Sequence, residues 1–304
     1  MSIIVESISK LYGAQKALDN VSFEVKTGHI TGFLGPNGAG KSTMMKIMTG
    51  YIPASSGRVI IDGTEVGPEN IDLKRRVGYL PENNPLYPEM YISEYLQFVA
   101  SLYIPKGDRK RAVDDVIEVT GLGPERNKKI GELSKGYRQR VGLAQALIHN
   151  PDVLILDEAT TGLDPNQVVG IRSLISQAGR EKTVMISTHI MQEVEAICDR
   201  IIIIDRGVIV ADDDKENIGR LLQKKTTSVI VEFDGNPAIE SLMAIEGVGK
   251  VTRGRNREFI VDSATGKDIR PALFAWAVAN SLTVLSLRQQ ENNLEEIFRH
   301  LTTT

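Results

Sequence analysis

The residues with the clearest chemical meaning form a glycine-rich loop, GPNGAGKS (35–42), with the spacing GxxxxGKS. An apolar run, 30–34, precedes the loop, and a run with helical character, 43–48, follows it. Between a strand and a helix, such a loop points backbone N–H groups into one concavity where phosphate groups bind. Its lysine reaches the outer phosphates and its serine hydroxyl ligates Mg²⁺. We therefore predict a nucleotide site made of Gly35, Pro36, Asn37, Gly38, Ala39, Gly40, Lys41, Ser42 and Thr43.

Two adjacent acids, Asp157 and Glu158, follow a second apolar run, 153–156. This pattern is typical of a strand that is buried on both faces and that places charged side chains at its carboxyl end. We predict that Asp157 ligates Mg²⁺ beside Ser42. We also predict that Glu158 acts as the general base on a water in line with the terminal phosphate. The alternative is that the two acids only cap the following turn.

A histidine, His189, follows another predicted buried strand, 183–188. The carboxyl end of a strand in a parallel sheet is where ligands bind, so His189 is a candidate for the same site. The alternative is a solvated histidine or one with its hydrogen bonds satisfied in the core.

The string LSKG contains a serine and a glycine, Ser134 and Gly136, before a run of helical character, 141–148. A helix N-terminus with these residues predicts a second anion site. One chain with two half-sites for one nucleotide suggests that two copies of the chain face each other.

These motifs occur in a fixed order: the phosphate loop, the LSxG signature, the acidic strand, the segment 161–164 and the histidine. In this order they resemble the ATP-binding subunits of ABC transporters, over residues 1 to about 220. The resemblance implies an α/β P-loop ATPase that binds ATP and Mg²⁺, with Glu158 and His189 as catalytic residues. It also implies a sandwich of two copies around ATP and a transmembrane permease as partner.

Two site residues are matched through this resemblance alone. Tyr12 corresponds to the aromatic residue that stacks on adenine, a contact that any π-face can make. Glu82 occupies the position where the family usually carries a glutamine that senses the metal and the transmembrane partner. A carboxylate can bind Mg²⁺ but cannot donate a hydrogen bond, so Glu82 is expected at the metal while the sensing role is put in question.

The signature departs from the family pattern, with Lys135 for the usual glycine and Tyr137 for glutamine, and Ala159 replaces a proline. The phosphate-contacting pair, Ser134 and Gly136, remains. The string LSKGYRQR resembles the branch that includes drug, sodium and other exporters. The strings YLPENNPLY, STHIMQEVEAICDR and TGLDPNQ look closer still to the ATP-binding subunit associated with bacterial gliding motility.

The composition is that of an ordinary soluble globular protein, with 41% hydrophobic and 25% charged residues and a net charge of −3. The sequence shows no basic face that would bind nucleic acid, so no nucleic-acid partner is expected. Glu6 and Lys10 interrupt the first apolar stretch, and the longest uncharged run, 271–287, is shorter than the roughly 20 residues of a membrane span. We expect a cytoplasmic protein held on the inner face of the bacterial cell membrane by its permease partner.

The single cysteine, Cys198, cannot form an internal disulfide, which suits a reducing cytosol. A buried small apolar residue on the helix after His189 is favoured over a reactive thiol.

Two domains are predicted. Residues 1–220 form the ABC ATP-binding domain, with a helical subdomain at about 83–150, and a charged linker with a helix begins at Ala211. Residues 221–304 form a small α+β ferredoxin-like accessory domain, because apolar alternation and helical spacing there follow the order βαββαβ. Its strands are expected at 228–233, 250–253, 258–262 and 282–288, and its helices at 238–245 and 268–280, with a further helix at 294–301.

Three functions fit this sequence: an ATPase subunit that drives a membrane partner, a soluble ABC ATPase acting on ribosomes or DNA, and a regulatory nucleotide-binding module. Soluble translation factors of this superfamily carry two cassettes in tandem, and its DNA-repair members insert a long coiled coil. Neither feature occurs here. A pure sensor would not need Glu158 and His189, so the membrane-coupled ATPase is favoured.

Overall fold

The computed structural model describes residues 1–304 except 68, 219–227, 255–256, 265–266 and 290–304. The chain divides into two units, Met1–Lys215 and Glu216–Thr304. The predicted domain boundary at residue 220 and the predicted helix at 294–301 both fall outside the described residues.

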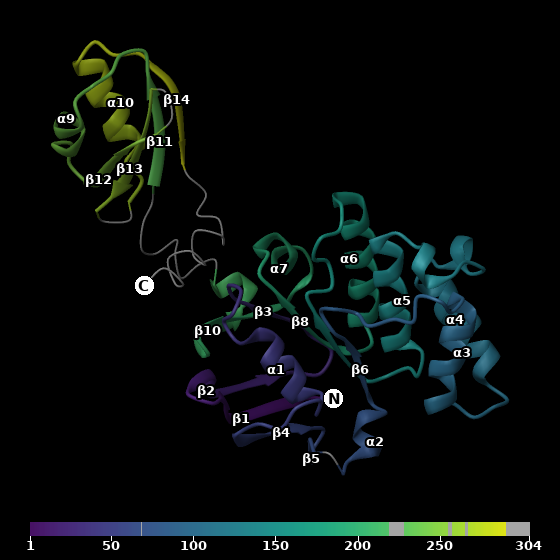
Figure 1. Ribbon diagram of the computed structural model, residues 1–304. Helices are drawn as coiled ribbons and strands as arrows, with labels where there is room; N and C mark the ends of the chain where they lie inside the picture. The colour runs from purple at the N-terminus through teal and green to yellow at the C-terminus, as the bar shows by residue number, and fades with distance from the viewer. Residues whose placement is uncertain (68, 219–227, 255–256, 265–266, 290–304) are drawn as a thin grey trace. The chain divides into compact units, whose positions relative to one another are not determined.

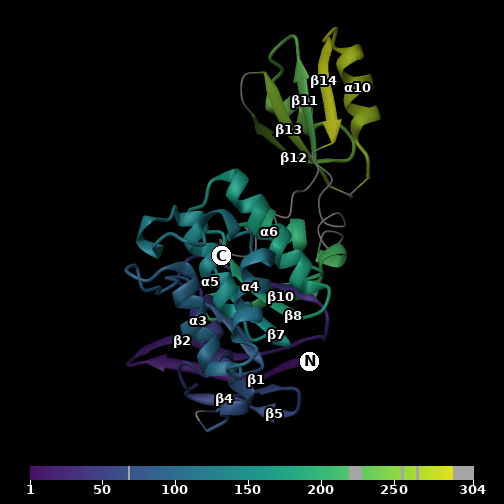
Figure 2. The ribbon, with the colours of Figure 1, turned by 90° about the vertical axis from the view of Figure 1, so that its right-hand side faces the viewer.

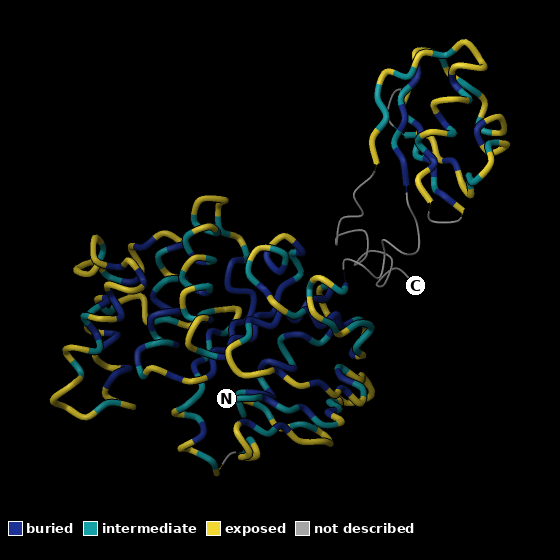
Figure 3. The backbone as a smooth tube through the Cα atoms, turned by 180° about the vertical axis from the view of Figure 1, so that it is seen from behind, coloured by how far each residue is buried: buried dark blue, intermediate teal, exposed yellow. Residues whose placement is uncertain are grey.

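A six-stranded sheet in the order β10-β9-β3-β8-β7-β6 forms the centre of the first unit. All neighbours in it pair in parallel except β10, which runs antiparallel to β9. Every residue of β7 and β8 is buried, which confirms the prediction that both faces of these strands are covered. Such buried segments run through the interior of the unit in Figure 3. The strands are β3 (Ile30–Leu34), β6 (Val77–Leu80), β7 (Val153–Asp157), β8 (Thr183–Thr188), β9 (Arg200–Asp205) and β10 (Val208–Asp214).

The edge strand β10 corrects one expectation from the sequence. A linker and a helix were expected from Ala211, but residues 211–214 continue β10, and helix begins only at 215. The reason is a partner on the neighbouring strand: Arg200 donates hydrogen bonds from Nε and Nη2 to the two carboxylate oxygens of Asp212, at 2.7 and 2.8 Å. This bidentate pairing stabilises the strand conformation of a segment whose composition favours a solvated linker.

A second sheet, antiparallel and in the order β2-β1-β4-β5, packs against the helix that follows the glycine-rich loop. This helix, α1, contacts β2 of the second sheet and β7 and β8 of the first, and Figure 1 shows it between them. Met44 and Met45 of α1 share one buried core with Val5 and Ile155. The core therefore fixes the start of α1 against both sheets. The bounds are β1 (Ile3–Tyr12), β2 (Gln15–Val25), β4 (Ser56–Ile61), β5 (Thr64–Glu65) and α1 (Lys41–Met48).

The opposite face of the first sheet is covered by α6 (Pro165–Gly179) and α7 (Met191–Ile197), which contact β8, and α7 also contacts β3. A Cβ atom on Gly32 of β3 would lie 2.8 Å from Val194 Cγ1 and 3.0 Å from Cys198 Sγ, so only glycine allows α7 this close. Cys198 is buried as predicted, although it is the C-cap residue of α7 and not part of the helix.

Three helices between β6 and β7 pack on one another and enclose a core of their own, in the region where the sequence predicts a helical subdomain. They lie together in both views of the ribbon (Figures 1 and 2). Their bounds are α3 (Ile92–Tyr103), α4 (Arg109–Val119) and α5 (Lys135–Leu147), and a short helix, α2 (Ile71–Lys74), precedes β6. Across the part of the chain that the structure describes, none of the helices combines the length and the apolar character needed to cross a membrane.

In its described residues from 228 on, the second unit contains a four-stranded antiparallel sheet in the order β12-β13-β11-β14 and two helices. The chain order βαββαβ and this sheet order are those of a ferredoxin-like domain, which confirms the predicted architecture. Its core gathers aromatic and aliphatic side chains of both helices and the sheet, Phe233 and Phe259 among them. The elements are β11 (Ser228–Phe233), α9 (Ile239–Met243), β12 (Val248–Arg253), β13 (Glu258–Ser263), α10 (Arg270–Ala279) and β14 (Val284–Gln289).

Candidate active site

The glycine-rich loop joins β3 to α1, as its spacing predicts. Gly38 and Gly40 have φ angles of 81° and 107°, in the left-handed region that side-chain-bearing residues rarely adopt. A Cβ atom on Gly40 would also lie 2.6 Å from the carbonyl oxygen of Ala17 on β2. Glycine is therefore required both for the backbone conformation of the loop and for its contact with the second sheet.

Lys41, the first residue of α1, folds back into the loop. Its Nζ donates to the carbonyl oxygens of Gly35 and Pro36 at 2.8 and 3.1 Å and lies 3.3 Å from Glu158 Oε1. Only 5% of the lysine side chain is exposed. The ammonium group is thus held at the inner wall of the loop, beside the position that the loop prepares for phosphate groups.

Asp157, at the end of β7, is fully buried. Its Oδ1 accepts hydrogen bonds from the hydroxyls of Ser42, at 3.2 Å, and Ser187. Its Oδ2 has no hydrogen-bond partner among the described residues. Burial raises the pKa of the Asp157 carboxyl, and the two hydroxyl hydrogen bonds oppose that change. A buried carboxylate oxygen without a partner is a position that a cation would satisfy.

Oxygen atoms of three residues meet here, because Ser42 Oγ also lies 3.4 Å from Glu82 Oε2. Hydroxyl and carboxylate oxygens are the ligands that Mg²⁺ prefers, usually with substrate phosphates completing its shell. The described residues contain no cluster of three or more His, Cys, Asp or Glu side chains arranged to hold a metal. Mg²⁺ needs only one or two carboxylates when phosphates complete its shell. Ser42, Asp157 and Glu82 therefore fit Mg²⁺ held together with phosphate oxygens.

Glu158 and His189 lie in direct contact. His189 Nδ1 is 2.8 Å from Glu158 Oε2 and 3.1 Å from Oε1, and the hydroxyl of Thr161 donates to Oε2 at 2.6 Å. The glutamate backbone has a φ of 52°, an uncommon value for a residue with a side chain. Its N–H donates to the carbonyl and hydroxyl oxygens of Ser187, which hold this conformation. The carboxylate is thus fixed beside the phosphate loop.

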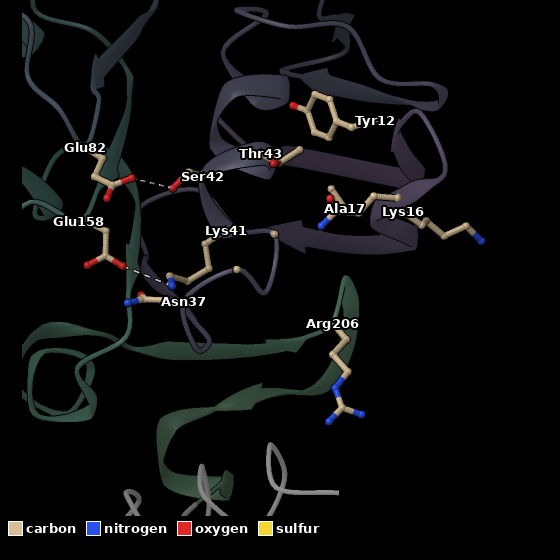
Figure 4. Close-up of a pocket in the computed structure, with 13 residues that line it drawn as sticks. Tyr12, Lys16, Ala17, Asn37, Lys41, Ser42, Thr43, Glu82, Glu158 and Arg206 are labelled. Carbon is tan, nitrogen blue, oxygen red and sulfur yellow. Dashed lines mark hydrogen bonds and ion pairs between the residues drawn. The ribbon is translucent and has the colours of Figure 1, made fainter.

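A cavity of about 740 Å³ joins these residues to a second group on the first two strands. Figure 4 shows Tyr12 and Lys16 at one end and Glu82 and Glu158 at the other, with the phosphate loop between them. The predicted residues that line it are Tyr12, Asn37, Gly38, Gly40, Lys41, Ser42, Thr43, Glu82 and Glu158. Five other predicted residues do not line this cavity: Gly35, Pro36, Ala39, Asp157 and His189.

The aromatic end of the cavity can accept a planar base. Tyr12 is 50% exposed, and Lys10 Nζ lies 5.4 Å from the centre of its ring. An exposed aromatic face at one end and a phosphate-binding loop at the other match the chemistry of a nucleoside triphosphate.

The comparisons with known proteins agree with this geometry. The family described as ABC transporter matches residues 18–161, which include the phosphate loop and Glu158. The linearmycin resistance ATP-binding protein of Bacillus subtilis (strain 168) is 34% identical to the chain over 303 residues, covering 98% of this chain and 97% of that protein. The chain belongs to the ATP-binding subunits of ABC transporters. The bacitracin transport ATP-binding protein of Bacillus licheniformis is 33% identical to this ABC subunit over 305 residues, with the same coverage.

Solved ABC cassettes share the fold of the ATP-binding unit. A dimeric bacterial ABC transporter cassette is 26% identical, with a TM-score of 0.64, and covers 70% of this chain and 98% of that one. A dimeric cassette in a post-hydrolysis state bound to ADP and Pi is 25% identical, with a TM-score of 0.65 and the same coverage. The predicted α/β P-loop ABC ATPase fold is therefore confirmed, and the chain is an ABC ATPase.

The signature residues of this ABC subunit lie apart from its own nucleotide cavity. Ser134 is the N-cap residue of α5, accepts a hydrogen bond from the N–H of Tyr137 at 3.4 Å, and is exposed. Gly136 is buried, and a Cβ atom there would lie 2.5 Å from Gln167 Cδ. Neither residue lines the cavity. Within one copy of the ABC subunit, the two predicted half-sites are therefore separate.

Several site residues of the ABC subunit were missed by sequence reasoning. Gln15, Lys16, Ala17 and Arg206 line the cavity because the β1–β2 hairpin and the β9–β10 turn meet the phosphate loop. Spacing along the chain carries no signal for such contacts. Ser187 binds both Asp157 and the backbone of Glu158, and its hydroxyl in a predicted buried strand was an available clue.

Proposed function

We propose that this ABC ATPase works as a dimer of two copies, hydrolyses ATP in two composite sites, and drives a membrane-embedded permease that exports its substrate. The observation that carries this proposal is the placement of Glu158 between Lys41 and His189, at 3.3 and 2.8 Å. A buried carboxylate in that position is suited to act on the terminal phosphate of a nucleotide in the loop.

In this proposal different residues of the chain bind the phosphates, bind the base and activate the water. The loop N–H groups and Lys41 hold the phosphates, and Tyr12 holds the base. Glu158 accepts a proton from the attacking water, the water oxygen bonds to the γ-phosphorus, and the bond to the bridging oxygen breaks to leave ADP and phosphate. His189 keeps the Glu158 carboxylate in place through the contact at its Nδ1. Mg²⁺, when bound at Ser42, Asp157 and Glu82, neutralises part of the phosphate charge.

The second copy supplies Ser134 and Gly136 in this proposal. Support comes from their position outside the cavity of their own chain and from the start of α5 at Lys135, next to the N-cap serine. The positive end of the helix dipole at that point can meet phosphate charge that Lys41 leaves unpaired. Cassettes of similar fold are described as dimeric, one of them with ADP and Pi bound.

A membrane permease partner is supported by the surface of the helical subdomain. Tyr87, Phe98 and Leu102 are each about half exposed there, and the rings of Tyr87 and Phe98 lie 6.2 Å apart. An exposed apolar group of this kind is suited to receive a helix of another protein. The subunit would then sit on the inner face of the bacterial cell membrane through its permease.

Export is supported by two relatives, one named for linearmycin resistance and the other for bacitracin transport. A narrower assignment, to gliding motility, rests on the strings quoted above and has no support in the names of these relatives. Co-purification of the chain from membranes, with identification of the co-eluting polytopic protein, tests the permease and separates the two assignments.

The dimer is tested by mixing two variants. Ser134→Arg leaves the phosphate loop intact and Lys41→Ala leaves the signature intact, so their heterodimer contains one complete composite site while each homodimer contains none. Single-turnover hydrolysis of ATP should exceed the sum of the two separate variants. If mixed dimers form and show no such gain, the face-to-face arrangement is wrong for this protein.

A further inference from the structure

Glu193, on α7, is a buried carboxylate that the proposed hydrolysis does not use. It is 4% exposed, and no Lys, Arg or His of the described residues forms an ion pair with it. A charge taken out of water is costly unless its oxygen atoms accept hydrogen bonds. The identity of its hydrogen-bond donors therefore shows what holds this residue in place.

Both donors are hydroxyls of buried threonines. The hydroxyl of Thr160 donates to Glu193 Oε1, and that of Thr188 donates to Oε2 at 2.7 Å. Thr160 and Thr188 are 5% and 1% exposed. The same Thr188 oxygen accepts a hydrogen bond from the N–H of Ile190 at 3.0 Å. One carboxylate thus fixes the turn after β7 and the end of β8 together.

These two segments carry the hydrolytic pair. Thr160 follows Glu158 by two residues, and Thr188 directly precedes His189. The left-handed backbone of Glu158, with φ at 52°, persists only where the surroundings hold it. Ser187 holds it from β8, and the bridge from Glu193 to Thr160 is a second restraint on the same turn.

We infer that Glu193 is a positioning residue for ATP hydrolysis: through Thr160 and Thr188 it sets the placement of the Glu158 carboxylate relative to the His189 ring. This inference rests on the proposed roles of Glu158 and His189. Among the described residues, Glu193 does not line the nucleotide cavity, and it forms no hydrogen bond or ion pair with Glu158 or His189. Its effect is therefore on the rate of the chemical step and not on nucleotide binding.

The test uses two substitutions at the same position. Glu193→Met keeps the length of the side chain and removes both acceptors, whereas Glu193→Gln keeps a polar end that can bond both hydroxyls. A displacement of about 1 Å can cost about 10²-fold in rate. We expect Glu193→Met to lower the single-turnover rate at least about tenfold with the ATP dissociation constant within about twofold of wild type, and Glu193→Gln to restore most of the rate.

Matched variants separate positioning from folding. Thr160→Val and Thr188→Val should each lower the rate, while Thr160→Ser and Thr188→Ser, which keep the hydroxyl, should not. Glu195→Met, on the same helix and less buried, should leave the rate unchanged. Thermal melting of every variant shows which of them are folded at the assay temperature.

Two results would overturn the inference. One is a folded Glu193→Met with a rate within twofold of wild type; the other is a Glu193→Gln as impaired as Glu193→Met. Glu158→Gln is measured in parallel: if it too hydrolyses ATP at the wild-type rate, the proposed function fails together with the inference. If Glu158→Gln is inactive while Glu193→Met is not, only the inference about Glu193 fails.

Discussion

Lys41 Nζ lies 3.3 Å from Glu158 Oε1, and neither side chain is more than 6% exposed. The cation that the loop offers to phosphates is therefore in contact with the carboxylate proposed to activate water. Phosphate groups that bind Lys41 compete with Glu158 for the same ammonium. We therefore expect nucleotide entry to change the surroundings of the proposed general base as well as to fill the site.

Replacement of the proposed base should separate binding from hydrolysis. Glu158→Gln is expected to keep ATP binding, because Lys41 and the loop N–H groups remain, and to slow hydrolysis by about 10²–10⁴-fold. It should also trap an ATP-bound dimer that gel filtration detects. Glu181→Gln, at an exposed position, serves as the control. Turnover within a few-fold of wild type at saturating ATP and Mg²⁺ would remove Glu158 from the role.

The aromatic end of the cavity should distinguish the base from the phosphates. Tyr12→Ala is expected to weaken ATP by the loss of stacking, about 1–3 kcal/mol, and to leave the affinity for inorganic triphosphate nearly unchanged. Tyr12→Trp should restore ATP binding. Calorimetric titration with ATP and with triphosphate measures the two affinities. Tyr51→Ala is the control, because Tyr51 is exposed and lies outside the cavity. An equal loss for ATP and triphosphate would contradict adenine stacking.

The carboxylate at residue 82 should set the Mg²⁺ requirement. Because Glu82 Oε2 lies 3.4 Å from Ser42 Oγ, Glu82→Gln removes one negative charge from the metal position. We expect the Mg²⁺ concentration for half-maximal hydrolysis to rise about tenfold. Mn²⁺ binding in the presence of a non-hydrolysable ATP analogue, followed by electron paramagnetic resonance, should weaken in parallel. Glu65→Gln, on the surface, is the control, and an unchanged Mg²⁺ profile would place Glu82 outside the metal shell.

The thiol of Cys198 should be inert while the protein is folded. Burial raises the pKa of Cys198 to about 12, so almost none of it is thiolate at pH 8, whereas an unfolded cysteine has a pKa of about 8.5. A disulfide reagent at pH 8 should therefore label the native chain at least about 10²-fold more slowly than the unfolded chain. Ala196→Cys, at an exposed position nearby, supplies a reactive reference. Rapid labelling of native Cys198 would show that its pocket opens.

The sequence predicted those parts of the site whose residues lie close together along the chain. The phosphate loop combines strand, glycine spacing, lysine and helix within one short segment, and the two acids follow directly on a buried strand. Lys16, Arg206 and Glu193 were missed because their roles depend on segments that only the folded sheet brings together. β10 was missed for the same reason, since its acidic end is paired by Arg200 from the neighbouring strand.

The acidic end of β10 has a consequence for how the protein behaves in concentrated solution. β10 lies at the edge of its sheet, where a row of backbone groups faces away from β9 and can template a strand of another molecule. Beyond Asp212, which Arg200 pairs, Asp213 and Asp214 place like charges on any two copies that approach edge to edge. We expect this charge to disfavour aggregation through strand addition, because like charges on two approaching edges repel one another.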